Sequence, residues 1–323
     1  MLLHQSFFSA FFRIAAMSIR DLLLALLTVT IWGGNVIAVK LGMVEIPPLL
    51  MTTLRLSVVT VILIPFVRLK LRNVRWILLF SVTFSTLHFS LMFLGLKMAE
   101  AGTGAILLQM GTPIATLLGV LVFKERLSRL QLCGLLISLS GVVMLTFSPA
   151  IPPLLPFLLL LGSALAWAVS NLIAKHTPQI DMMELICWSS FFGAPQVAFL
   201  SYVCEHGQLA SLRSTSWVGW SAVAYCAVLS SALGYLLWYG LLRRYPIGKI
   251  MPLSLLSPVF SVIFGVLVFK DSADIKKIAG TIITIGGIVF MQYFSTPRLA
   301  KPAWLKRSWL LRCRLASRID NVP

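Results

Sequence analysis

The sequence predicts an all-α integral membrane protein with ten transmembrane helices, arranged as a 5+5 inverted repeat with both termini cytoplasmic. Three observations predict this fold class: the composition, the recurrence of apolar stretches, and a short segment that occurs twice. Of the 323 residues, 59% are hydrophobic and only 11% are charged, whereas soluble domains carry about 25% charged residues. Because lipid offers the backbone no hydrogen-bond partners, apolar stretches near spanning length are expected to be helices.

Short charged segments separate the apolar stretches and are too short to hold a soluble domain. Examples are "RLKLRNVR" (68–75), "KERLSR" (124–129) and the pair Arg243 and Arg244. The ten spans expected between such breaks are residues 22–43, 48–67, 76–96, 102–123, 130–147, 154–174, 183–203, 217–241, 248–269 and 276–294.

The net charge of +17 could indicate a nucleic-acid partner, but the basic residues lie at helix ends and in the C-terminal tail. Lys and Arg accumulate on the cytoplasmic side of membrane proteins. With both termini inside, 20 Lys/Arg fall in cytoplasmic segments, six fall outside and Arg55 falls within a span. The charge pattern therefore predicts cytoplasmic termini and no nucleic-acid binding.

A short segment occurs twice, 146 positions apart. "GVLVFK" begins at Gly119, where Glu-Arg follows it, and again at Gly265, where Asp-Ser follows it. Aligned without gaps, residues 119–145 and 265–291 are identical at ten of 27 positions. We interpret the repetition as an internal duplication.

A second pair of segments supports the duplication more weakly. "WGGNVIAVK" (32–40) and "WAVSNLIAK" (167–175) both place Lys eight residues after Trp, but Asn35 and Asn171 are out of step by one. If one unit holds five helices, an odd number, the second copy enters the membrane from the opposite side. Inverted repeats of this kind are typical of secondary transporters, which bind substrate near the membrane midplane. A passive scaffold of duplicated helices is the alternative.

The last helix of each copy carries two glycines one heptad apart, Gly134 and Gly141 in the first and Gly280 and Gly287 in the second. Small residues let membrane helices approach closely. The helix face that carries these glycines has two possible partners: the corresponding helix across the pseudo-twofold axis, or a second chain in a homodimer.

Long stretches of the chain resemble a known family. "LLALLTVTIWGGNVIAVKLGMVEIPPLLMTTLRL" and "AGTGAILLQMGTPIATLLGVLVFKERLS" are similar to the first half of the EamA family of the drug/metabolite transporter superfamily, with its Trp-Gly-x-Asn-x-x-x-x-Lys pattern. "ALGYLLWYGLLRRYPIGKIMPLSLLSPVFSVIFGVLVFKD" is similar to the second half. The resemblance covers residues 22–294. It departs from the family at Lys270 and Asp271, where the family has Gly-Glu, so this motif is interpreted as structural.

Within the family, four motifs look most like the branch of O-acetylserine/cysteine exporters: "LLQ" (107–109), "GYLLW" (234–238), "LLRRY" (241–245) and "PLSLLSPV" (252–259). The resemblance implies a multi-pass protein of the bacterial inner membrane that exports a small-molecule substrate by alternating access. Amino acids of the cysteine/O-acetylserine type are the leading cargo, and drugs or other metabolites are the alternative.

Two cations are candidate binding groups because polar groups inside a membrane are costly and often functional. Lys40 lies near the outer end of the first span, where it either extends its ammonium to the interface or faces a cavity and binds a substrate carboxylate. Arg55 lies eight residues into the second span, so it either pairs with protein groups or binds an anionic substrate.

The remaining candidates are polar and aromatic. Asn35, Asn171 and Gln109 either hydrogen-bond a polar substrate or brace the helices. Aromatic side chains either line the cavity or belong to the lipid-facing belt, and these are Trp32, Trp167, Trp188, Tyr235 and Trp238. Pro113, Pro252 and Pro258 interrupt two helices, as in transporters with discontinuous helices or as simple kinks.

The sequence places every Asp and Glu in loops, tails or terminal turns. His88 is the one histidine expected in mid-membrane and is a weak candidate for proton coupling, with packing as the alternative. Without a midplane carboxylate, facilitated efflux or exchange fits better than a pump. We find no enzyme motif, and the five scattered cysteines predict neither a disulfide framework nor a metal site, so no cofactor or metal is expected. A non-transporting membrane subunit is the remaining alternative.

We expect four segments: an N-terminal extension at 1–20, with Met17 as an alternative start; five-helix repeats at 22–147 and 154–294; and a tail at 295–323. The tail carries seven Lys/Arg and is interpreted as either an anchor to anionic lipid or a disordered segment.

Overall fold

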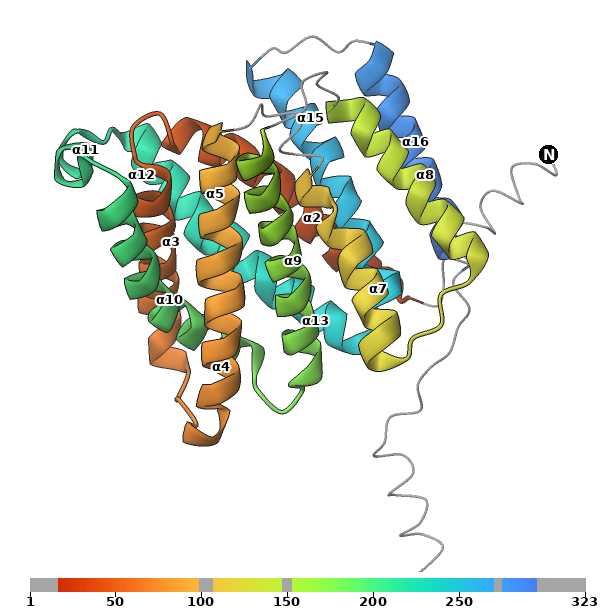
Figure 1. Ribbon diagram of the computed structural model, residues 1–323, viewed down its shortest axis with the longest axis horizontal. Helices are drawn as coiled ribbons and strands as arrows, with labels where there is room; N and C mark the ends of the chain where they lie inside the picture. The colour runs from red at the N-terminus through yellow and green to blue at the C-terminus, as the bar shows by residue number, and fades with distance from the viewer. Residues whose placement is uncertain (1–16, 99–106, 147–152, 270–274, 295–323) are drawn as a thin grey trace, which may run out of the picture.

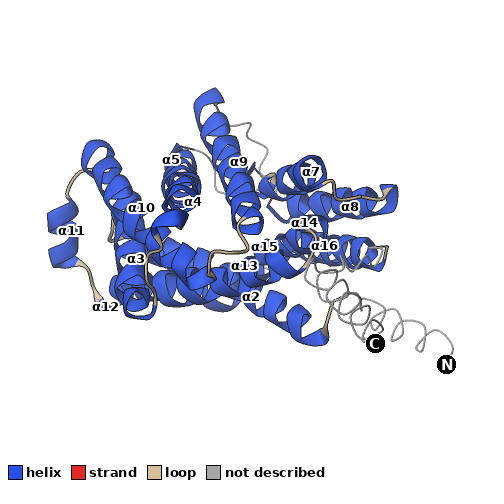
Figure 2. Ribbon diagram, turned by 90° about the horizontal axis from the view of Figure 1, so that it is seen from below, coloured by secondary structure: helices blue, strands red, loops and turns tan. Residues whose placement is uncertain are grey.

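A computed structural model describes residues 17–98, 107–146, 153–269 and 275–294, and every regular element in these ranges is helical (Figures 1 and 2). Most of the predicted N-terminal extension and the basic tail lie outside the described residues. The pair Lys270 and Asp271 lies outside them as well.

Helix is found at each of the five spans expected in the first half of the chain. The first two are α2 (Ile19–Gly42) and α3 (Pro48–Leu63), the latter continued by the 3-10 turn η1 (Ile64–Phe66). The third is one continuous stretch of four elements: the 3-10 turn η2 (Leu71–Asn73), α4 (Val74–Phe80), the π-helical run η3 (Ser81–His88) and α5 (Phe89–Met98). The last two are α7 (Gly111–Phe123) and α8 (Arg129–Thr146).

The second half follows the same order and adds one short helix that we did not expect. It begins with α9 (Leu154–His176), α10 (Met182–Cys204) and the short, unexpected α11 (Gln208–Ser214). One continuous stretch then holds α12 (Trp217–Ala224), the π-helical run η4 (Tyr225–Gly234) and α13 (Tyr235–Arg244). The next holds α14 (Ile247–Ile250), the 3-10 turn η5 (Met251–Leu255) and α15 (Leu256–Phe269), and the last helix is α16 (Ile275–Tyr293).

Within the described residues, seven helical stretches are long and apolar enough to cross a membrane. They are Ile19–Gly42, Pro48–Phe66, Leu71–Gly95, Leu154–His176, Trp217–Arg244, Ile247–Val268 and Ile275–Tyr293, and two shorter apolar helices run Leu107–Phe123 and Arg129–Met144. The chain is therefore a multi-pass membrane protein, and ten crossings remain a prediction.

Local sequence explains where the helices begin. Ser18 accepts a hydrogen bond from the Asp21 backbone N–H at 3.1 Å, and Asp181 accepts one from the Met183 N–H at 2.8 Å, so both act as N-caps. Pro252 lies where α14 passes into the 3-10 turn η5, so the helix predicted over 248–269 is interrupted as expected at this proline.

The first copy of the repeated segment, with the Glu-Arg that follows it, ends α7 and turns the chain into α8. Lys124 has a positive φ of 53° and ends the helix in the left-handed conformation. Ser128 and Gln131 then form a reciprocal capping box: the Ser128 N–H donates to Gln131 Oε1 at 2.8 Å, and the Gln131 N–H donates to Ser128 Oγ at 3.1 Å. The motif therefore builds a tight reversal and leaves Glu125 at its centre.

The glycine faces of α8 and α16 pack against each other within one chain, at one edge of the bundle (Figures 1 and 2). A Cβ on Gly134 would lie 2.9 Å from the carbonyl oxygen of Gly287, and a Cβ on Gly141 would lie 2.7 Å from that of Gly280. The pairing of the earlier glycine of each helix with the later glycine of the other means that the two helices run antiparallel.

We expect Gly287→Leu to weaken this contact, because the added side chain would meet Ser138, whose N lies 2.5 Å from the Cβ position. Overpacking of this kind costs about 1–3 kcal/mol, so the midpoint of thermal unfolding in detergent should fall. Gly286→Leu is the matched control, because nothing lies within 4 Å of a Cβ there. Equal midpoints for the two variants would contradict the packing assigned to α8 and α16.

Helices at matching positions of the two halves also make matching contacts. α3 packs against α10, and the contact of α2 with α15 is mirrored by that of α9 with α7. The two π-helical runs match as well: the 146-residue offset of the repeated segment carries η3, residues 81–88, onto 227–234 within η4.

Candidate functional site

A pocket of about 280 Å³ lies between the two halves, lined from α2, α3, α5, α9, α13 and α15 and from the stretches that adjoin them. Seven of the residues singled out from the sequence line it, namely Trp32, Asn35, Arg55, His88, Gln109, Trp167 and Tyr235. Four others do not, namely Lys40, Asn171, Trp188 and Trp238. Residues as far apart in the chain as Trp32 and Val262 thus line one site, because its walls come from helices of both halves.

Arg55 provides the formal positive charge of the pocket, and the lining contains no Asp or Glu. Its side chain is only 3% exposed. Its Nε donates to the Ser231 hydroxyl, and its guanidinium carbon lies 4.4 Å from the centre of the Phe89 ring. No carboxylate in the described part of the chain forms an ion pair with it. The pocket therefore favours an anionic group over a cationic one.

Polar atoms for further hydrogen bonds come from Asn35, Gln109 and a row of serines. The Asn35 side-chain oxygen is buried and finds no hydrogen-bond partner among the described residues. Ser254, Ser257 and Ser261 line the same pocket from η5 and α15. These groups suit a small substrate that carries both donors and acceptors.

His88, the last residue of η3, is held in place by α9. Its Nδ1 lies 3.1 Å from the carbonyl oxygen of Ser163 and 3.0 Å from the Ser163 hydroxyl, which in turn donates to the His88 carbonyl at 2.8 Å. Its ring stacks at 5.9 Å on Phe84. His88 is therefore both packed and part of the pocket wall.

Aromatic rings close one side of the pocket. The ring of Trp32 lies 5.1 Å from that of Tyr235 and 5.0 Å from that of Trp238. Trp238 is fully buried beneath the lining, and its Nε1 donates to Asn171 Oδ1 at 2.9 Å. Asn171 thus positions an aromatic ring and does not reach the pocket.

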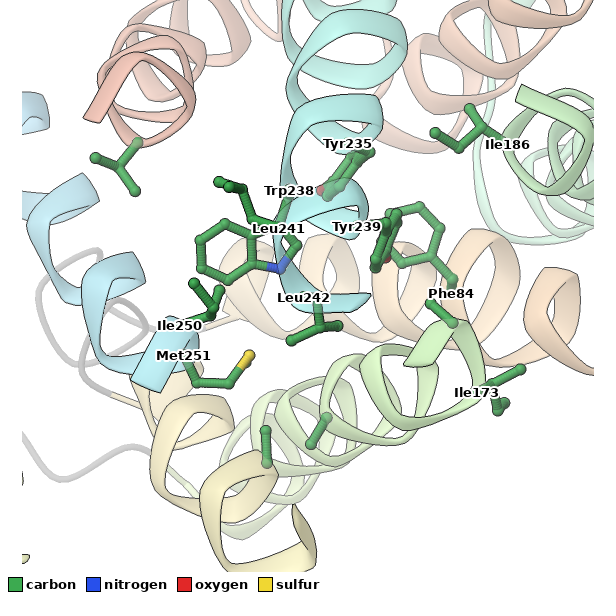
Figure 3. Packing of buried hydrophobic residues seen from close by; sticks show 14 of the residues in the cluster. Phe84, Ile173, Ile186, Tyr235, Trp238, Tyr239, Leu241, Leu242, Ile250 and Met251 are labelled. Carbon is green, nitrogen blue, oxygen red and sulfur yellow. The ribbon is translucent and has the colours of Figure 1, made fainter. Parts of the chain in front are cut away.

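Trp238 belongs to a layer of buried side chains that lies below the pocket (Figure 3), which we call the closing layer. Its members are Trp238, Tyr239, Leu241, Leu242, Ile250 and Met251. All six are at most 1% exposed. The layer separates the pocket from the end of the bundle at which α2 starts, which we call the closed end.

Polar contacts seal the closed end. Asp21 accepts from Arg244 at 2.8 Å and from the Tyr245 hydroxyl at 2.6 Å. Burial of Tyr245, together with its hydrogen bond to Asp21, raises the pKa of the hydroxyl, which therefore stays protonated and donates. Arg243 donates to three backbone carbonyls, those of Ala174, Thr177 and Ile180.

Two of the remaining candidates lie elsewhere. Lys40 is exposed near the end of α2. Trp188 packs with Phe191 and Phe192 on α10, at ring distances of 5.3 and 6.4 Å. The described residues contain no group of three His, Cys, Asp or Glu side chains that could hold a metal ion.

The serines of the pocket were missed from the sequence, although a signal exists. Ser254, Ser257 and Ser261 follow at intervals of three and four residues, which places them on one face of a helix. In an otherwise apolar span such a stripe predicts a polar cavity.

Comparisons with known proteins agree with this architecture. The EamA-like transporter family matches twice, at residues 20–147 and 154–293. A probable amino-acid metabolite efflux pump of Salmonella typhimurium is 30% identical over 84% of this chain and 94% of its own, and one of the same name in Escherichia coli is 28% identical over the same shares. A solved crystal structure has the same fold, with a TM-score of 0.72 at 17% identity over 84% of this chain and 96% of its own. The chain belongs to the EamA-like transporter family.

Proposed function

We propose that the protein is a secondary transporter that exports small polar metabolites by alternating access. Amino acids of the cysteine/O-acetylserine type are the leading substrates. The observation that carries the proposal is the pocket between the two halves, with buried Arg55 as its formal charge and no acidic residue in its lining. A substrate carboxylate would bind the guanidinium, because a charge-assisted pair is strong away from water.

The arrangement of the helices supports ten crossings in a 5+5 inverted repeat. Corresponding helices α8 and α16 run antiparallel, as an odd number of helices per unit requires, and the other helices pack in matching pairs. The excess of Lys and Arg supports cytoplasmic termini, in the inner membrane of a bacterium. The basic tail would then lie at anionic lipid on that side.

Drug efflux by the same fold is the second candidate, and the charge of the pocket argues against cationic drugs. A carboxylate would be needed to offset a buried organic cation, and the lining offers none. The lining also offers no carboxylate for proton coupling, so we propose facilitated efflux or exchange. His88, which lines the pocket, is the candidate for a proton-coupled alternative.

The test is efflux from proteoliposomes loaded with labelled cysteine, O-acetylserine or unrelated cationic drugs, with and without a pH gradient. We expect efflux of the amino acids with little dependence on the gradient and none of the drugs. Efflux of drugs alone would overturn the substrate assignment. Lys40→Ala should behave as the unmodified protein, because Lys40 lies outside the pocket lining.

A further inference from the structure

Three segments meet at the closed end around one carboxylate, that of Glu125. The loop between α7 and α8 supplies Glu125, the last turn of α9 supplies Lys175, and the start of α14 supplies two backbone N–H groups. The side chains of Glu125 and Lys175 are each 15% exposed. Glu125 belongs to the first half of the chain, and every group that it contacts here belongs to the second half.

Both oxygens of the Glu125 carboxylate are used. Oε1 accepts from the Ile247 N–H at 2.9 Å and lies 3.2 Å from Lys175 Nζ, and Oε2 accepts from the Gly248 N–H at 3.1 Å. Lys175 Nζ also donates to the carbonyls of Tyr245 at 2.5 Å and Leu242 at 3.3 Å. The Glu125–Lys175 pair thus links the end of α9, the end of α13 and the start of α14.

The two halves also approach closely at this place. A Cβ on Gly119 of α7 would lie 3.0 Å from the Cβ of Ile247. Ile250 and Met251, which belong to the closing layer, follow Ile247 within four residues. A path from the pocket to the closed end therefore cannot form unless the start of α14 moves away from α7 and from Glu125.

We propose that Glu125 is a latch between the two halves: it holds the closed end shut while the pocket faces the other side, and it releases α14 and Lys175 when the pocket opens to the closed end. This inference rests on the alternating access proposed above. It gives a role to the Lys-Glu pair at the end of the first copy of the repeated segment, because Lys124 turns the chain and thereby presents Glu125 to α14.

Glutamine tests the latch with little change in shape. Glu125→Gln keeps one acceptor oxygen but replaces the other by an NH₂ group, which cannot accept from the Gly248 N–H, and it removes the charge that faces Lys175. The closed state should lose stability relative to the state open at this end. Lys175→Gln is a second variant that removes the ion pair and leaves both backbone contacts of Glu125 in place.

Glu184 is a matched control at the same end of the bundle. Its carboxylate is 3% exposed, accepts from the Lys70 N–H at 3.2 Å and from Asn73 Nδ2 at 2.9 Å, and lies 3.7 Å from Lys70 Nζ. It resembles Glu125 in chemistry but contacts no part of α14. Glu184→Gln should therefore lower stability without changing which end is open.

Cysteine labelling in nanodiscs, where both faces are in contact with the reagent, reads out the conformation of the full chain. In a background without the five native cysteines, Met251→Cys reports water access to the closing layer and Val36→Cys reports access to the pocket from the other side. We expect Glu125→Gln to raise the maleimide labelling rate at the first position relative to the second by about tenfold, Lys175→Gln to raise it less, and Glu184→Gln to leave the ratio unchanged.

An unchanged ratio in folded Glu125→Gln and Lys175→Gln would overturn the latch, and so would an equal change in Glu184→Gln. If Glu125→Gln does not fold, the result with Lys175→Gln decides. The assay measures conformation and not transport, so a failure to find a transported substrate would count against the proposed function without altering this result.

Discussion

Arg55→Met is expected to reduce transport of carboxylate substrates strongly and to leave the thermal stability of the protein unchanged or higher. The guanidinium is buried, donates to the Ser231 hydroxyl and lies over the Phe89 ring, and no described carboxylate forms an ion pair with it. A buried charge without an ionic partner costs free energy that an apolar side chain of similar size does not. The buried charge is therefore better explained by the binding of an anionic ligand than by stabilisation of the fold.

The measurement combines efflux from proteoliposomes with thermal unfolding in detergent. Loss of a charge-assisted hydrogen bond should weaken apparent affinity about 10- to 100-fold, and Arg55→Lys should recover part of it because the charge stays and the planar fork is lost. A fall in unfolding temperature together with normal efflux would assign Arg55 a structural role instead.

Trp238→Ala is expected to give the largest loss of stability of any single change in the closing layer. Trp238 is fully buried, contacts the ring of Trp32 at 5.0 Å and donates to Asn171. Truncation of a buried Trp costs about 3–5 kcal/mol and leaves the side-chain oxygen of Asn171 without its donor. The gap would also lie directly beneath the pocket.

Trp217→Ala is the matched control, because Trp217 is 84% exposed. Thermal unfolding should separate the two variants clearly, with the control close to the unmodified protein. Equal losses would mean that the layer in Figure 3 does not carry the packing that we assign to it.

The sequence predicted those parts of the fold that depend on strong local signals. The glycines of α8 and α16 indicated a close helix contact, and the structure identifies its partner as the corresponding helix of the same chain. Pro252 indicated a break, and α14 passes into a 3-10 turn there. In both cases a single residue type permits or prevents one backbone arrangement.

The π-helical runs η3 and η4 could not be predicted in this way. A shift of backbone hydrogen bonds depends on how neighbouring helices pack, and no residue type specifies it. Their matching positions, with His88 at the end of one and Ser230 within the other, bring them to the pocket from both halves.

Only part of the candidate site could be predicted. The sequence shows the type of each residue, but it does not show the direction in which the side chain points from its helix. Asn35 and Asn171 stand one position out of step after their tryptophans, and one residue rotates a side chain by about 100° around a helix. Asn35 consequently faces the pocket, whereas Asn171 binds Trp238. Lys40 was chosen for its charge, but its place at the end of α2 leaves it outside the lining.

The central claim is that one pocket carries carboxylate metabolites from one side of the membrane to the other by alternating access. Counterflow in proteoliposomes tests it most directly: vesicles preloaded with unlabelled O-acetylserine are diluted into a trace of labelled cysteine. We predict that the label accumulates transiently above its equilibrium level, and that Arg55→Met removes this overshoot. Entry of label that is independent of the internal amino acid, or absent altogether, would contradict the account.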